Sequence, residues 1–269
     1  MASPTYELEH ILNTMFTFEL SFIFRNPKEI NKIIDKIELY LGSLRKNGQI
    51  LGKEHPLIHK NNSLISYVFV PEKKSLNKKY SNKYVLKNYN EIIESKTEIS
   101  CEIIGKEIVS AKICRCSLID NYILYTDYLT LEPPLRCGNC FGVIPLYKIP
   151  KTYDDEYYDI LSWETQYQSC DTLQMNCCVG EKFGTKQMSD YNSDLTKCGI
   201  DICSKIKTLT GKNVYYYLYR YVYNPIMKKE INRKCPSCGG DWILENTLFE
   251  KFNFKCDECS LLSNISKGV

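Results

Sequence analysis

Four cysteines near the C-terminus constrain the fold of this chain more than any other feature. They form two Cys-x-x-Cys pairs, Cys235 with Cys238 and Cys256 with Cys259. Each pair can place two thiolates on one tight turn, and the gap between the pairs lies in the range typical of four-cysteine zinc sites. The segments 241–244 and 252–254 alternate in the manner of two short strands. The pattern therefore predicts a zinc ribbon that binds Zn2+, and the alternative is a disulfide pair or a set of buried free thiols.

Composition sets the broad class of the protein. The chain has 269 residues, of which 43% are hydrophobic, enough for a sizeable core. Its 14 cysteines would suit a disulfide framework only in a short secreted protein. Residues 1–15 include acidic residues and lack the basic start and apolar run of a signal peptide. No stretch is long and apolar enough to span a membrane. We therefore expect a cytoplasmic protein with reduced thiols and no membrane partner.

The first half of the chain predicts a sheet with helices. Residues 16–24 alternate between apolar and polar side chains, as in a half-buried strand. A helix should follow, with Asn26 as its N-cap, Pro27 at its first helical position and Asn47-Gly48 as its stop. Further elements are expected in the order strand, helix, strand and strand, at 64–70, 84–94, 100–104 and 122–131.

The second half predicts two helices and a strand before the ribbon. One helix should continue from the acidic and aromatic segment 153–158, a second should run over 193–209 and end at Gly211, and a strand should occupy 214–223. The fold class is α+β: an N-terminal strand-helix-strand open sheet, a helical and β middle region, and a small C-terminal zinc ribbon. The expected divisions are an extension at 1–15, an α+β domain at 16–224 with a subdivision near 132, and the ribbon at 225–269.

A third Cys-x-x-Cys pair, Cys137 and Cys140, could form half of a second metal site. Two more ligands would be needed, and the sequence does not choose among the candidates Cys114, Cys116, Cys177 and Cys178. The alternative is that the pair packs in a turn without metal.

Several segments match the pattern of a known family. They are Leu44-Arg-Lys-Asn-Gly-Gln-Ile-Leu-Gly52, Pro134-Leu-Arg-Cys-Gly138 with Ile144-Pro-Leu-Tyr147, Asp171-Thr-Leu-Gln-Met-Asn176, Tyr215-Tyr-Tyr-Leu218, and Arg233-Lys-Cys-Pro-Ser-Cys-Gly-Gly-Asp-Trp242 through Phe254-Lys-Cys-Asp-Glu-Cys259 and Ser263-Asn264. Together they resemble a bacterial family of zinc-ribbon-containing proteins of unknown function with a proposed nucleic-acid-binding role. The resemblance implies one architecture ending in a ribbon, a cytoplasmic location and no assigned enzymatic activity.

Enzyme signatures are absent from the sequence. It has no phosphate-binding glycine loop, no Gly-x-Ser-x-Gly elbow and no His-Glu-x-x-His helix. A zinc ion with four cysteine ligands also has no open position at which to activate water. We therefore expect a non-enzymatic protein.

Nucleic-acid binding requires positive charge, because phosphate contacts supply most of the non-specific affinity. The formal charge of the whole chain, +3, is too small to indicate it. The densest basic run, with no acidic residue inside it, consists of Lys73, Lys74, Lys78, Lys79, Lys83 and Lys87. Its alternative interpretation is a solvated surface. Trp242 in the ribbon could stack on a base. The alternative function is a protein–protein interaction module, an adaptor or an inhibitor/immunity-type protein, whose ribbon presents Trp242 and Phe249.

Overall fold

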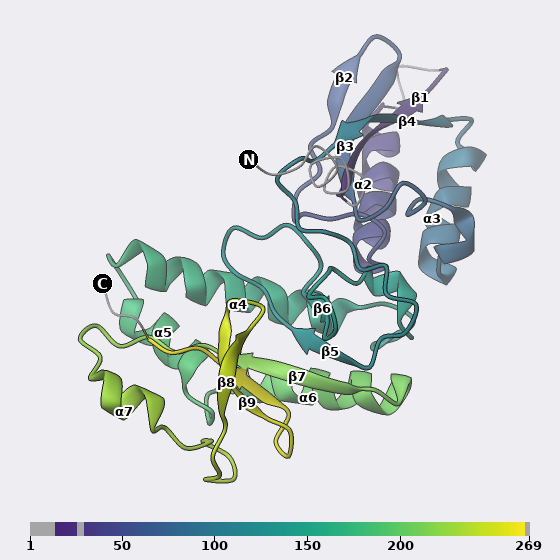
Figure 1. Cartoon of the computed structure of the whole chain (residues 1–269). Coiled ribbons are helices and arrows are strands. Elements are labelled where there is room, and N and C mark those ends of the chain that lie inside the picture. The colour runs from purple at the N-terminus through teal and green to yellow at the C-terminus, as the bar shows by residue number, and fades with distance from the viewer. Residues whose placement is uncertain (1–13, 26–29, 267–269) are drawn as a thin grey trace, which may run out of the picture. The chain divides into compact units, whose positions relative to one another are not determined.

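The computed structural model describes residues 14–25 and 30–266 (Figure 1). The chain divides into two compact units. Unit 1 contains the described residues up to 115 together with 131–133 and 142–158. Unit 2 contains 116–130, 134–141 and the described residues from 159 onward. The predicted α+β class is confirmed, with N-terminal strands and helices, two sheets, and C-terminal strands that carry four cysteines.

Unit 1 is built on a four-stranded antiparallel sheet in the order β2-β3-β1-β4. Its strands are β1 (Phe16–Ile23), β2 (Ile58–Lys60), β3 (Ser63–Val70) and β4 (Glu98–Lys106). The helices α2 (Ile30–Lys46) and α3 (Lys83–Glu94) pack on each other beside this sheet (Figure 1). The alternation in β1 buries Phe18, Leu20 and Phe22 in a core that also contains Ile37 and Leu41 of α2.

The end of α2 follows the sequence prediction. Gly48 has a φ of +73°, which a residue with a side chain adopts only under strain. A Cβ at this position would also lie 2.8 Å from Leu146 Cβ, so the turn approaches its neighbour closely. Helix α2 is described from Ile30. The predicted N-cap Asn26 and Pro27 lie outside the described residues.

Unit 2 contains a six-stranded sheet in the order β6-β5-β7-β10-β9-β8. Its strands are β5 (Asn121–Leu124), β6 (Leu135–Cys137), β7 (Asn213–Leu218), β8 (Ile243–Leu248), β9 (Phe252–Cys256) and β10 (Leu261–Ser263). Its helices are α4 (Tyr158–Asn176), α5 (Glu181–Ser189), α6 (Asp194–Thr210) and α7 (Met227–Ile231), and short 3-10 turns occur at Lys78–Tyr80 and Leu146–Lys148 in unit 1. Helix α6 lies along β7 (Figure 1).

The cysteine-bearing strands extend this sheet. Strand β10, which the sequence did not predict, pairs with β7 in parallel and with β9 in the antiparallel sense. The two-stranded hairpin expected from the sequence is therefore hydrogen-bonded to the same sheet as β5 and β7, through three residues that follow the last cysteine.

Two predicted strands are shorter than expected, and side chains explain both corrections. The strand expected over 122–131 ends at Leu124, because Asp127 Oδ1 accepts hydrogen bonds from Leu129 N (3.2 Å) and Thr130 Oγ1 (2.6 Å) and closes a turn. The strand expected over 214–223 ends at Leu218. Beyond that point Arg220 N donates to Asn264 Oδ1 and Asn264 Nδ2 donates to Arg220 O, both at 2.8 Å. The Asn264 side chain thus makes the hydrogen bonds that a neighbouring strand would otherwise make.

The helix expected to continue from 153–158 is present as α4, but the acidic residues 154–156 do not form its start. Asp154 and Asp155 have φ values of +37° and +61°, and Glu156 N donates to Tyr153 O at 2.7 Å. These residues form a tight turn, and α4 begins only at Tyr158. None of the helices in residues 14–25 and 30–266 is long and apolar enough to cross a membrane.

Candidate metal centres and a lysine-lined cavity

The C-terminal cysteines converge on one point. The sulfurs of Cys235, Cys238, Cys256 and Cys259 all lie within 4.8 Å of one another. Cys238 Sγ and Cys256 Sγ are 3.7 Å apart. A tetrahedral zinc ion with Zn–S bonds of about 2.3 Å places its sulfur ligands about 3.8 Å apart. The group therefore has the dimensions of a four-thiolate metal site.

The turns that carry these cysteines have a common backbone form. Gly239 N donates to Cys235 O at 2.9 Å, and Gly239, the residue after the first pair, has a φ of +73°. Ser260, the residue after the second pair, has a φ of +53°. The main-chain N–H of Gly240 lowers the pKa of the Cys238 thiol, whereas burial raises the pKa of Cys256 to about 12. Metal binding at this site would therefore release protons.

A second four-cysteine group consists of Cys114, Cys116, Cys137 and Cys140, whose sulfurs also lie within 4.8 Å of one another. The structure thus selects Cys114 and Cys116 as the companions of the third pair. Cys177 and Cys178 belong to neither group. Either group could hold a metal ion.

Local hydrogen bonds fix both halves of the second group. Cys114 N donates to Val143 O at 2.9 Å, next to an isolated bridge between Ile113 and Val143. In the other half, Phe141 N donates to Cys137 O at 2.8 Å and Phe141 has a φ of +58°, the same turn as in the C-terminal group. Asn139 N lies 3.4 Å from Cys137 Sγ and donates to it.

Three of the six predicted lysines gather around one cavity of unit 1, with a volume of about 460 Å³. They are Lys73, Lys74 and Lys79, and the cavity is also lined by Arg115 and Lys148, two basic residues that the sequence analysis did not single out. Neither residue belongs to the lysine run, so no local pattern marked it. Glu72 also lines the cavity, and Lys148 Nζ lies 2.6 Å from its Oε1.

The loop that carries these lysines is tied to buried polar residues. Gln49 Nε2 donates to Ser75 O at 2.8 Å, and Asn47 Nδ2 donates to Tyr80 O at 2.8 Å. The hydroxyl groups of Ser75 and Tyr147 lie 2.8 Å apart. Asn47, Gln49 and Ser75 are fully buried, so these hydrogen bonds anchor the loop to the interior of unit 1.

The other lysines of the run have other surroundings. Lys83 pairs with Asp154 at 3.1 Å and Lys87 with Glu91 at 3.9 Å. Lys78 Nζ lies 4.1 Å from the centre of the Tyr89 ring. The six lysines are therefore not one continuous site, although all six are exposed.

The expectation that Trp242 is offered to a base is wrong. Its side chain is 2% exposed, and its Nε1 donates to Arg233 O at 3.0 Å. The indole packs on Phe254 with ring centres 5.1 Å apart, inside the hairpin's own core. Phe249 is half-buried and stacks on Phe141 at 5.1 Å. Trp242 is thus unavailable to a partner, and the ring of Phe249 is largely occupied.

Three family models match the chain, and each is described as a domain of unknown function. They are DUF8589 at residues 15–105, DUF2310 at 116–219 and DUF8594 at 225–268. None of these descriptions mentions zinc, so the zinc-ribbon family expected from the sequence stays a prediction. A crystal structure of a conserved protein from Methanosarcina mazei Go1 is 9% identical with a TM-score of 0.30, covering 37% of this chain and 98% of that one. That likeness is too weak to support a conclusion.

Two relatives come from Haemophilus influenzae, and each bears the name "Uncharacterized protein". The second is 42% identical over 144 residues, which cover 54% of this chain and 70% of the relative. The first is 33% identical over 254 residues, which cover 93% of this chain and 96% of the relative. Similarity of this extent shows common descent along nearly the whole length, and the chain belongs to the family of these Haemophilus influenzae proteins.

Proposed function

We propose that this is a non-enzymatic, cytoplasmic zinc protein that binds nucleic acid through the lysine-lined cavity of unit 1. The observation that carries the proposal is the placement of Lys73, Lys74 and Lys79 around one cavity with two further basic residues. Phosphate groups are the usual ligands of such clusters, and they supply most of the affinity for nucleic acids.

Zinc is the metal that best fits the two cysteine groups. Four thiolates in tetrahedral contact favour zinc over the harder cations, which prefer oxygen ligands. Four cysteines also fill every position of a tetrahedral ion, so neither site would activate a water molecule. The metal would hold local structure, and binding would take place elsewhere on the protein.

The charge balance of the cavity supports a polyanionic ligand. Five basic side chains line it against one carboxylate, that of Glu72, and Glu72 is already paired with Lys148. No ion pair is present for Lys73, Lys74 or Lys79 within the described ranges. A phosphate that enters the cavity could therefore bind these three lysines without breaking an ion pair to a protein carboxylate.

The chain itself supplies a matched control. A triple variant with Lys73, Lys74 and Lys79 changed to Gln loses three charges inside the cavity. A second triple variant with Lys78, Lys83 and Lys87 changed to Gln loses three charges from the same run outside it. Fluorescence anisotropy with labelled single-stranded DNA and RNA should show at least about tenfold weaker binding for the cavity variant and a much smaller loss for the control.

Two outcomes would contradict the proposal. Equal losses in both variants would show that net charge alone sets the affinity, so the cavity would not be the site. Wild-type binding weaker than about 0.1 mM at physiological salt would be no better than ordinary non-specific attraction.

A protein partner is the second candidate, and strand β4 favours it. This strand is an edge of the four-stranded sheet and carries exposed apolar side chains at Ile103 and Ile104, the latter 54% exposed. Exposed edge strands can accept a strand from another protein. An Ile104→Lys variant should then lose a partner that the wild type still retains after nuclease treatment of the lysate. Equal retention by both proteins would rule out this edge.

A further inference from the structure

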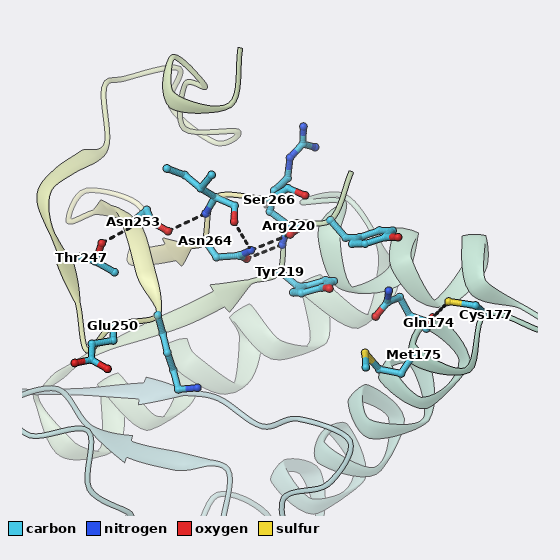
Figure 2. A pocket seen from close by; sticks show the side chains of 13 residues that line it. Gln174, Met175, Cys177, Tyr219, Arg220, Thr247, Glu250, Asn253, Asn264 and Ser266 are labelled. Carbon is cyan, nitrogen blue, oxygen red and sulfur yellow. Dashed lines mark hydrogen bonds between the residues drawn. The ribbon is translucent and has the colours of Figure 1, made fainter. Parts of the chain in front are cut away.

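Unit 2 contains a cavity of about 680 Å³ that neither the metal groups nor the lysine cluster uses (Figure 2). It is lined by the end of α4, the segment after β7, the β8–β9 hairpin and the segment after β10. Its volume lies within the range of about 300–1,000 Å³ that is usual for small-molecule sites. In the view of Figure 2, Gln174 and Met175 of α4 lie on one side of Tyr219, and Thr247 and Glu250 of the hairpin lie on the other.

Gln174 gives this cavity an unfilled hydrogen-bonding position. Its side chain is only 4% exposed, and its Oε1 has no hydrogen-bond partner among the residues that the structure describes. The side chain is directed from α4 toward Tyr219 (Figure 2). A buried amide oxygen without a donor is unfavourable. A ligand that donates an N–H to this oxygen would remove that deficit.

The other amide side chains of the cavity are already satisfied. Asn264 bonds both N and O of Arg220, at 2.8 Å each. Asn253 accepts from Ile265 N at 2.9 Å and donates to Thr247 Oγ1 at 3.0 Å. These bonds fix the wall opposite α4 in place. Gln174 is therefore the amide that remains for a ligand.

Tyr219 supplies an aromatic surface beside that oxygen. Its main-chain N donates to Met188 O at 3.2 Å, which anchors the residue. Its ring meets Tyr217 edge-on at 6.4 Å. Burial raises the pKa of Tyr219 to about 12, so the phenol is neutral at physiological pH. Tyr221 also lines the cavity, two residues further along the chain.

The charges around the cavity do not favour a highly charged ligand. Arg220 is engaged by the buried carboxylate of Glu230, with Nη2 and Oε1 2.5 Å apart. Lys251 and Glu250 are both exposed on the hairpin and offset each other. Recognition here would depend on ring packing and hydrogen bonding more than on phosphate contacts.

We propose that this cavity binds a nucleobase, whose exocyclic amine donates to Gln174 Oε1 and whose ring packs against Tyr219. Glutamine side chains read adenine in this way elsewhere, and tyrosine rings stack on any base. The site lies in unit 2 and does not rest on the lysine cavity of unit 1. The base can come from a nucleic-acid strand or from a free nucleotide, since both present the same ring and amine.

The test compares two oligonucleotides that differ only in the exocyclic amine of the base. Anisotropy is measured with labelled oligodeoxyadenosine and with the matching oligomer of purine 2′-deoxyriboside, the same ring without its 6-amino group. Wild type should bind the adenine oligomer about fivefold or more tightly, the lower end of the discrimination that base hydrogen bonds give. Gln174→Leu should lose this preference. Gln166→Leu, on the exposed face of the same helix, should keep it.

Folding is checked separately, because Leu at position 174 removes an unpaired buried oxygen and should not lower the melting temperature. Competition by adenosine monophosphate with the same dependence on Gln174 would assign the site to free nucleotides, and its failure to compete would assign it to strands. Equal affinity of wild type for the two oligomers, no binding of either, or an unchanged preference in Gln174→Leu overturns the inference. The salt dependence of binding should not change in Gln174→Leu, which separates this result from the lysine test.

Discussion

Gly138→Ala is expected to release the metal of one cysteine group while leaving the other group intact. Gly138 lies between Cys137 and Cys140, and its N–H donates to Asn121 O of β5 at 2.8 Å. A Cβ at position 138 would lie 1.6 Å from Asn121 Oδ1 and 2.9 Å from the main-chain Asn121 O. The turn that holds two of the four sulfurs therefore has no room for a side chain.

The size of the effect follows from these distances. Carbon–oxygen contacts seldom fall below about 3.3 Å. Rotation of the Asn121 side chain would remove the shorter contact but leave the main-chain contact about 0.4 Å too close. Metal–ligand distances tolerate shifts of about 0.2 Å, so at least one sulfur must leave its ideal position. We expect a loss of affinity on the order of 10–100-fold, as for other changes just outside a ligand set.

The assay is a zinc-to-protein ratio measured after dialysis against increasing concentrations of a chelator. Wild type should hold two zinc ions, and Gly138→Ala should fall to one while the C-terminal site stays filled. Gly240→Ala is the matched control, because a Cβ there would lie 3.4 Å from Cys238 Sγ, an ordinary contact. Two zinc ions held by Gly138→Ala with wild-type affinity would refute the reasoning, and so would a wild type that holds only one.

Three further substitutions test buried residues of unit 2 that hold polar contacts. Burial raises the pKa of Asp171 to about 6, above its value in an unfolded chain. The folded state therefore binds the proton more tightly than the unfolded state does, and the stability of the wild type falls as pH rises from about 4 to 7. Asp171→Asn should therefore raise the free energy of unfolding in urea at pH 8 by on the order of 2 kcal/mol, and this gain should shrink toward pH 5.5. Trp242→Phe should lower the stability by about 1–2 kcal/mol, because it leaves Arg233 O without its donor, and should not change single-strand affinity in anisotropy. Glu230→Gln should cost about 3 kcal/mol in urea denaturation, because the carboxylate is 3% exposed and pairs with two arginines.

Sequence reasoning succeeded where the signal is local. Alternation of side chains predicted β1, helical spacing predicted α2, and the strand and helix expected at 64–70 and 84–94 are present as β3 and α3. Helix α6 begins and ends where its capping residues indicate: Ser193 Oγ accepts from Thr196 N at 3.1 Å, and Gly211 has a φ of +70°. The two cysteine pairs of the C-terminal hairpin were also predictable from local sequence, because their spacing alone brings each pair onto one turn.

The remaining features depend on contacts between distant parts of the chain. Strand β10 is three residues long and is defined by its pairing with β7 and β9, so no local pattern marks it. Cys114 is positioned by an isolated bridge between Ile113 and Val143, which the sequence does not show. The alternating pattern correctly predicted that the side chains of Trp242 and Ile243 point in opposite directions, and Ile243 is the exposed one. The pattern does not show which of the two side chains packs in the core.

The salt dependence of nucleic-acid binding tests the proposed function most directly. Each phosphate contact with a single strand contributes about 0.7 to the slope of log affinity against log salt. If Lys73, Lys74 and Lys79 each bind a phosphate, changing all three to Gln should flatten the slope by about two. The control variant at Lys78, Lys83 and Lys87 should change it by much less. A slope that is the same in wild type and in the cavity variant would contradict the account.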